Sequence, residues 1–358
     1  MPTAGRQKPT ANSQSMTRHS KDHDRWKKIV ASFPDVSVTV LGDLVADEFV
    51  FGEIARVSRE APVLILKHRE RTVVPGGGGN AIMNLAALGV NVLPVGVVGD
   101  DEPGHLLIEA LHQKKIPTGG IHRLKHHTTT TKTRILAGMS HNSRQQVIRV
   151  DREPEPLEET HPVLLNLVNA AREYATASDA LMISDYGYGA ASPRLLTFVR
   201  SNGCLDNKPV TLDSRYRMLE FDGATAATPN EPEVEEALGI RIGNDNQKLL
   251  EAGQQLMKQM ELESLVITRG RDGMVAFERD SRPESIPIFG SDQVVDVTGA
   301  GDTVIATFTA SLAAGADATT AARLANLAGG LVVMKRGTAT VSAKELLGAI
   351  DQYAAAHP

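Results

Sequence analysis

Hydrophobic positions in the second half of the chain follow two alternating periods, which predict strands interleaved with helices. Helical spacing covers about residues 160–177, 193–202 and 247–260, and a further helix begins near residue 231. Short apolar runs, typical of buried strands, occupy residues 180–184, 209–212 and 265–268. Repeated strand and helix order indicates a mostly parallel sheet covered on both faces. We therefore predict an α/β fold whose ligands lie beyond the carboxyl ends of the strands.

The first half of the chain adds a second, smaller sheet to this picture. A strand at residues 36–41 is followed by residues 49–53 and by an alternating run at 63–67, neither of which has helical spacing. We expect these segments to form a small sheet that projects from the main body, with strands at about 49–74 and 121–150. The remaining elements are a helix over 81–88, a strand over 91–99 and a helix over about 103–115. We predict one body over residues 25–358, preceded by a disordered tail at 1–24.

Composition and charge exclude several classes of protein. The chain of 358 residues has a net charge of −5, which argues against a general nucleic-acid binder. Its single cysteine, Cys204, forms no internal disulfide and no cysteine-based zinc site, and this fits a reducing compartment. The first 24 residues lack the apolar core of a signal peptide, and no run is long enough to span a membrane. We expect a cytoplasmic protein with no nucleic-acid or membrane partner.

Two polar segments near the front of the chain are candidates for ligand binding. Asp43 and Asp47 follow the first predicted strand, where they would be able to bind sugar hydroxyls or would simply be solvated turn residues. Four glycines at residues 76–79 precede Asn80 and a helix, which permits close approach of the backbone to a ligand. The spacing fits neither a dinucleotide fingerprint nor a Walker A loop.

Residues 296–302, Asp-Val-Thr-Gly-Ala-Gly-Asp, form the most informative stretch of the sequence. The glycines allow a tight turn that brings N–H groups to the start of a helix predicted from Thr303 to about Ala314, and such a site favours an anion. Asp302 places a proton acceptor beside it, which suits phosphoryl transfer to a hydroxyl. The simpler interpretation is a turn with an aspartate helix cap.

A cluster of cations in residues 122–152 contrasts with the acidic whole. Its members, set against one acid, Asp151, are Arg123, Lys125, Lys132, Arg134, Arg144, Arg149 and Arg152. Such an excess fits a wall for an anionic substrate, for example a sugar that already carries a phosphate. A solvated face of an exposed hairpin is the alternative.

Three ordered motifs together resemble those of the PfkB, or ribokinase-like, carbohydrate kinases. The motifs are the glycine-rich loop at 76–80, Asn-Glu-Pro-Glu at 230–233 and the stretch at 296–302, and the likeness covers about residues 36–350. The resemblance implies a three-layer α/β/α sandwich with a small β-sheet lid. Within the family, the chain is most similar to D-glycero-β-D-manno-heptose-7-phosphate kinases, the kinase domains of bifunctional heptose synthesis proteins. These similarities lie at residues 42–47, 56–62, 132–134, 145–151, 184–186, 296–302 and 337–342.

The resemblance also implies roles for individual residues in an ATP-dependent transfer to the anomeric hydroxyl of the sugar. Asp302 would accept the proton, and the N–H groups of Gly299, Ala300 and Gly301 would stabilise the transferred phosphoryl group. Asn230 and Glu233 would organise Mg²⁺ through water, although the same pair also fits a helix capping box. The nucleotide would lie near Thr268, Arg269, Gly270 and Asn326. The sugar would lie near Asp43, Asp47, Gly77, Gly78, Asn80 and Asp185, with its phosphate facing Lys132, Arg134 and Arg149.

The expected cofactors are ATP and Mg²⁺, with a monovalent cation as a further candidate, and the expected assembly is a homodimer through the lid. Asp185 and Asp213 also fit simple caps of strand-end turns, and the helix around Asn326 also fits plain core. The alternatives are a ribokinase- or fructokinase-like kinase for an unphosphorylated sugar or a nucleoside, and a non-catalytic sugar-binding protein on the same fold.

The sequence departs from the family pattern in four places. Gly76 adds a glycine before the usual loop, Tyr188 stands near the place of an expected lysine, and residues 213–215 read Asp-Ser-Arg where Asp-Pro-Lys is usual. The sequence shows no second domain and no His-x-Gly-His nucleotidylyl-transfer motif before Pro358. These departures bear on the identity of the sugar more than on the chemistry.

Overall fold

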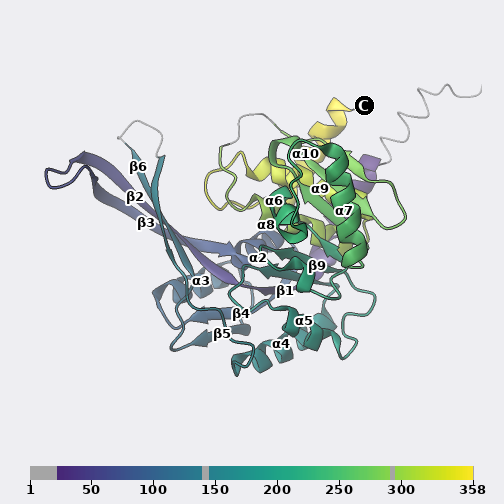
Figure 1. Cartoon of the computed structure of the whole chain (residues 1–358), viewed down its shortest axis with the longest axis horizontal. Helices are drawn as coiled ribbons and strands as arrows, with labels where there is room; N and C mark the ends of the chain where they lie inside the picture. Colours follow the sequence, from purple (N-terminus) through teal and green to yellow (C-terminus); the bar gives the residue numbers. More distant parts are fainter. Residues whose placement is uncertain (1–21, 139–144, 291–294, 358) are drawn as a thin grey trace, which may run out of the picture.

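The computed structural model describes residues 22–138, 145–290 and 295–357, and within these ranges one large sheet forms the centre of the molecule (Figure 1). Its nine strands lie in the order β13-β12-β11-β10-β9-β8-β1-β4-β5. The pairs from β5 to β11 are parallel, and β12 and β13 are antiparallel. The bounds are β1 (Ser37–Gly42), β4 (Asn91–Gly99), β5 (Gly120–Leu124), β8 (Ala180–Asp185), β9 (Val210–Ser214), β10 (Ala226–Ala227), β11 (Ser264–Thr268), β12 (Met274–Glu278) and β13 (Glu284–Ile286).

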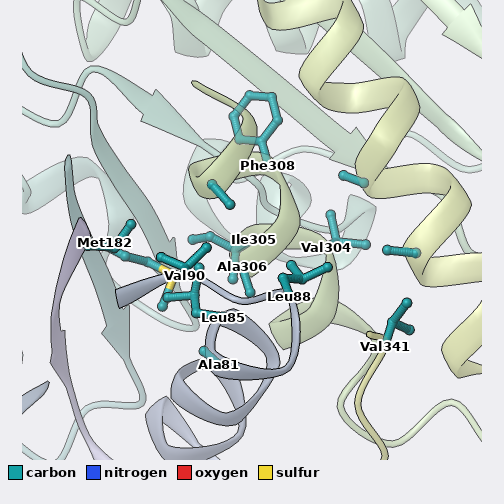
Figure 2. Packing of buried hydrophobic residues seen from close by; sticks show 14 of the residues in the cluster. Ala81, Leu85, Leu88, Val90, Met182, Val304, Ile305, Ala306, Phe308 and Val341 are labelled. Carbon is teal, nitrogen blue, oxygen red and sulfur yellow. The ribbon is translucent and has the colours of Figure 1, made fainter. Parts of the chain in front are cut away.

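Helices cover both faces of this sheet. Successive residues of a strand point to opposite faces, so each buried strand contributes apolar side chains to two clusters. In β8, Ala180 and Met182 belong to one buried cluster, whereas Leu181 and Ile183 belong to the other. The first cluster includes residues of α2 (Gly78–Ala87), α3 (Glu102–Gln113), α8 (Ala300–Ala313), α9 (Ala318–Val332) and α10 (Ala343–Ala356), and Figure 2 shows part of it. The second includes residues of α4 (Val163–Ala177), α5 (Pro193–Arg200), α6 (Glu231–Leu238) and α7 (Asn246–Gln259). The predicted three-layer α/β/α arrangement is confirmed.

Three short 3₁₀ turns lie between the longer elements of the described chain. The 3₁₀ turns are η1 (Phe33–Asp35), η2 (Met218–Glu220) and η3 (Gly270–Asp272). Within the described ranges, no helix combines the length and apolar character needed to cross a membrane.

A second sheet, which we call the lid, projects from the main body (Figure 1). Its order is β3-β2-β6-β7, with bounds β2 (Leu44–Val57), β3 (Leu64–Gly77), β6 (Thr131–Gly138) and β7 (Gln145–Arg152). The projecting sheet is confirmed, but the expected second segment at 121–150 begins too early. Residues 120–124 form β5, which pairs with β4 in the main sheet, so Arg123 is not a lid residue. Arg144 lies outside the described residues.

The N-terminal helix of the described chain extends across the expected boundary at residue 25. Residues 22–31 form a helix, which includes the last three residues of the tail expected at 1–24; residues 1–21 lie outside the described residues. Trp26, Ile29, Val30 and Phe33 recur at helical spacing and are all buried in the first cluster. The Trp26 ring lies 5.6 Å from that of Tyr353 in α10, so the N-terminal helix packs against the C-terminal helix of the described chain.

Replacement of Trp26 tests this docking. Trp26→Ala is expected to lower the free energy of unfolding by about 3 kcal/mol, because it empties a buried aromatic site. Phe198→Ala is the matched control: Phe198 is 45% exposed on α5, so its loss is expected to cost less than about 1 kcal/mol. Urea unfolding of both variants measures the difference, and equal stabilities would show that the N-terminal helix is not part of the cooperative core.

Candidate active site

Helix α8 begins at the carboxyl edge of the main sheet and carries Asp302 in its first turn. Gly299 is the N-cap, with a left-handed φ of 76°, and the helix starts at Ala300 and not at the expected Thr303. The Ala300 N–H donates to the carbonyl oxygen of Val297 at 3.2 Å, so in this structure it serves the turn itself. A Cβ on Gly299 would lie 2.3 Å from the side-chain nitrogen of Asn80, which explains why glycine is needed here.

Asp302 is buried and held from both sides. The Asn80 amide donates to its Oδ2 at 2.8 Å, and the Tyr186 hydroxyl donates to its Oδ1 at 3.0 Å. Burial raises the pKa of Asp302 to about 7; the two hydrogen bonds and nearby Lys132 oppose this shift, and the charge of Asp47 adds to it. A carboxylate with a pKa near neutrality is well matched to accept a proton from a hydroxyl.

Tyr186 is a residue of this site to which the sequence analysis assigned no role. It follows Asp185 at the end of β8, at the sheet edge where the other candidates lie. This position after a predicted strand could have identified Tyr186 from the sequence. Burial and then the charge of Asp302 raise the pKa of the Tyr186 hydroxyl well above its usual value, so it stays a hydrogen-bond donor. The Lys132 amine lies 5.6 Å from the centre of its ring.

Asp47 and the glycine-rich loop lie together at the base of the lid. Asp47 accepts from Arg134 at 2.5 Å and from the Thr338 hydroxyl at 3.1 Å. A Cβ on Gly76 would lie 2.4 Å from Asp47 Oδ2, so the additional glycine makes room for this carboxylate. Gly77 has a φ of 55°, and the Gly78 N–H donates to the carbonyl oxygen of Asp43 at 3.0 Å. These glycines allow the start of α2 to lie directly against the turn between β1 and the lid strand β2.

Asp43 and Asp185 lie beside the site, but their oxygens hold protein groups in this structure. Asp43 accepts four backbone N–H groups at 2.9–3.3 Å; they belong to residues 186, 188, 190 and 191. Asp185 accepts from the Ser214 hydroxyl at 2.7 Å and pairs with Arg217 at 2.7 Å. Because these carboxylates are already used, their observed role is to shape the loops after β8 and β9, and their contact with a sugar stays a prediction.

The three cations expected to face a substrate phosphate differ in their surroundings. Arg134 is paired with Asp47, and Arg149, about half-exposed, is paired with Asp151 at 2.9 Å. Lys132 is half-buried beside Tyr186, where burial and the charge of Arg215 lower its pKa. Lys132 is also one of the charges that lower the pKa of Asp302.

Three of the four expected nucleotide residues line a cavity at the α8 N-terminus. This cavity, of about 190 Å³, is lined by Thr268, Gly270 and Asn326 together with Ala300 and Gly301. Asn326 donates to the carbonyl oxygen of Pro287 at 2.8 Å, and its helix therefore contributes to both core and cavity. The fourth expected residue, Arg269, does not line the cavity, because its guanidinium donates to Glu231 at 2.5 Å.

A pair of carboxylates, Asp213 and Glu233, lies near Asp302 and fits a divalent cation. Asn230 and Glu233 form a complete capping box, each side chain accepting the backbone N–H of the other at 2.9 Å. Burial and the charges of Glu233 and Asp302 raise the pKa of Asp213 well above its usual value, and burial raises that of Glu233. Crowded carboxylates of this kind attract a cation. No group of three metal-ligating side chains occurs in the described ranges.

A buried proton acceptor in the first turn of a helix, with a cavity of about 190 Å³ at the same helix N-terminus and the base of a lid beside it, fits a phosphotransferase that acts on a sugar hydroxyl. Residues 41–345 match the pfkB family of carbohydrate kinases, and the chain belongs to this family. Kinases of this family use ATP and a divalent metal ion.

Two solved structures show the same ribokinase-like fold. The ribokinase of Arabidopsis thaliana complexed with ribose and ATP has a TM-score of 0.66 and 20% identity, over 88% of this chain and 98% of that one. Phosphofructokinase-2 of Escherichia coli in complex with potassium has a TM-score of 0.69 and 16% identity, over 89% and 99%.

Curated relatives are more similar in sequence. Bifunctional protein HldE of Geobacter metallireducens is 39% identical over 326 residues, which are 90% of this chain and 65% of that protein. Bifunctional protein HldE of Mesorhizobium japonicum is 37% identical over 329 residues, 90% of this chain and 64% of that protein. The chain thus spans a little under two thirds of the length of these relatives.

Proposed function

We propose that this carbohydrate kinase transfers the γ-phosphoryl group of ATP to the anomeric hydroxyl of D-glycero-β-D-manno-heptose 7-phosphate. The motifs that resemble heptose-7-phosphate kinases and the similarity to HldE proteins support this substrate. The observation that carries the chemistry is the buried Asp302, whose pKa of about 7 and position at the α8 N-terminus suit a general base.

In the proposed reaction, the anomeric oxygen attacks the γ-phosphorus while Asp302 takes its proton. The new bond joins this oxygen to phosphorus, the bond from phosphorus to the β,γ-bridging oxygen breaks, and ADP leaves with that electron pair. Asn80 and Tyr186 hold the Asp302 carboxylate, and the N–H groups of Gly299 and Gly301 would face the developing negative charge, whereas that of Ala300 would first have to leave Val297. Asn230, Glu233 and Asp213 would hold hydrated Mg²⁺, which supplies positive charge to the triphosphate.

We further propose that the lid closes over the substrate and pairs between two copies of the chain. Apolar side chains on β7 are about half-exposed: Val147 at 48%, Ile148 at 54% and Val150 at 52%. β7 is also an edge strand of the lid sheet, and such an edge is protected when a second sheet covers it. Closure would exclude water from the transferred phosphoryl group. Analytical ultracentrifugation tests the dimer, which Val150→Lys should weaken.

Lys132 tests whether the existing phosphate faces the lid. Lys132→Gln is expected to raise KM for a phosphorylated sugar about tenfold, because a charge-assisted contact is lost. It should leave KM for the matching unphosphorylated sugar nearly unchanged. Lys248→Gln on the exposed face of α7 is the control for loss of one positive charge. Equal KM changes for both sugars would contradict the proposed phosphate position.

One observation favours a second substrate class. Arg134 and Arg149 are already paired with Asp47 and Asp151, which leaves fewer cations for a phosphate. A kinase for an unphosphorylated sugar or a nucleoside is therefore the second candidate. Transfer of ³²P from ATP across a panel of free sugars, sugar phosphates and nucleosides distinguishes the two. Transfer to none of them would favour a non-catalytic sugar-binding protein.

A further inference from the structure

The chain leaving the lid runs directly against the loop that follows β8. The Leu157 N–H donates to the carbonyl oxygen of Tyr188 at 3.0 Å, and the Tyr188 hydroxyl donates to Glu153 Oε1 at 2.6 Å. Gly189, directly after Tyr188, adopts a φ of 95°. A Cβ at this position would lie 2.8 Å from the backbone of Leu157, so the two segments pack closely. Glu153 directly follows the last residue of β7, so the base of the lid and this loop are in close contact.

The same loop supplies one of the two hydrogen bonds that hold Asp302. Tyr186 stands two residues before Tyr188, and its hydroxyl lies 3.0 Å from Asp302 Oδ1. The buried Asp43 carboxylate accepts hydrogen bonds from four backbone N–H groups of residues 186–191, and these bonds restrict the conformation of the loop. Tyr186 and Tyr188 are thus tied to the same carboxylate, and we expect a displacement of one to reach the other.

Building on the proposed kinase function, we propose that Tyr188 and Glu153 form a clasp that couples the lid to the catalytic carboxylate. The clasp positions Tyr186 and, through it, the Asp302 side chain for proton transfer. Tyr188 and Glu153 are positioning residues, since neither touches Asp302. Tyr188 stands near the place where the kinases that this chain resembles carry a lysine, so a hydroxyl-to-carboxylate contact is a departure of this chain.

The hydrogen bond between Tyr188 and Glu153 is chemically suited to persist across the neutral pH range. Burial, and then the bond to Glu153, raise the pKa of the Tyr188 hydroxyl well above its usual value, so it remains a donor across the neutral range. A hydroxyl that donates to a carboxylate forms one of the stronger hydrogen bonds in proteins.

Kinetics of four variants test the clasp. Tyr188→Phe and Glu153→Ala are each expected to lower kcat about tenfold with KM changed less than about twofold, because the base is misplaced while binding surfaces stay intact. The double variant should be no slower than either single one. Glu153→Gln keeps an acceptor for the hydroxyl and should restore most of the rate. Glu159→Ala, in the same connecting segment but paired with Arg194 at 3.2 Å, is the control and should match the wild type.

The pH profile separates positioning from a general structural effect. Groups that act on Asp302 are Asp47 on β2, Lys132 on β6, Asp213 on β9, and the hydrogen-bond donors Asn80 and Tyr186. Loss of the Tyr186 bond removes a contact that lowers the pKa of Asp302. The acid limb of kcat should therefore move up by about one pH unit in Tyr188→Phe and Glu153→Ala, and not in Glu153→Gln.

Hydrogen exchange gives a readout that needs no activity. Amides of residues 186–191 should exchange faster in Tyr188→Phe and Glu153→Ala, and at the wild-type rate in Glu153→Gln and Glu159→Ala. Unchanged exchange with an unchanged acid limb, or an effect on KM alone, would overturn the clasp. If the wild-type protein phosphorylates no sugar, the proposed function fails, and the exchange rates still decide whether the clasp exists.

Discussion

Asp302→Asn is expected to lower kcat by about 10²–10⁴-fold, the range that general bases contribute. The amide keeps the shape of the side chain and its place between Asn80 and Tyr186, but it accepts no proton. In the wild-type protein, kcat should rise as pH increases through about 7, because the reactive form of Asp302 is the deprotonated one and burial raises its pKa to about 7. The variant should lack this rise. Steady-state kinetics with ATP and the best sugar of the panel measure both effects.

Stability measurements separate a missing base from a damaged fold. Because the folded-state pKa of Asp302 is raised from 3.8 to about 7, the free energy of unfolding falls as pH rises between these two values, and this loss is complete above pH 7. Asp302→Asn should therefore melt no lower than the wild type at pH 8. Asp206→Asn, in a surface loop, is the control for the change of one carboxylate. A rate within about tenfold of wild type would show that Asp302 is not the base.

Gly299→Ala is expected to lower kcat by about 100-fold, because it moves the group that holds the base. The new methyl group would stand 2.3 Å from the side-chain nitrogen of Asn80, which must shift away from Asp302. Alanine at a φ of 76° also costs about 1–2 kcal/mol of folding free energy. Kinetics and urea unfolding, measured on the same preparation, separate the two effects.

The matched control for this substitution is Gly348→Ala. Gly348 lies within α10, and a Cβ there meets nothing within 4 Å. Alanine in a helix interior is favoured over glycine by about 0.5–1 kcal/mol, so this variant should be slightly more stable and fully active. If Gly299→Ala retained full activity, the close packing of Asn80 against the α8 N-terminus would not matter for catalysis.

Much of the fold was available from the sequence because the two apolar periods are local signals. Helix and strand order and the projecting sheet follow from residue spacing, whereas α8 starts three residues before the predicted Thr303. The errors occurred where long-range contacts decide. Residues 22–24 look polar, but the helix that contains them packs on Tyr353 at the other end of the chain. Residues 121–124 were predicted to belong to the lid, yet pairing with β4 places them in the main sheet.

For the site, the sequence by itself determined which residue types gather at the carboxyl edge of the sheet, because parallel strands end on the same side. Only the tertiary structure decided which of them face one another. It directs Asn80 and Tyr186 onto Asp302, and it turns Asp43 toward the backbone of the loop after β8. These residues are up to 222 positions apart, and the direction of a side chain depends on packing between elements that no local pattern encodes.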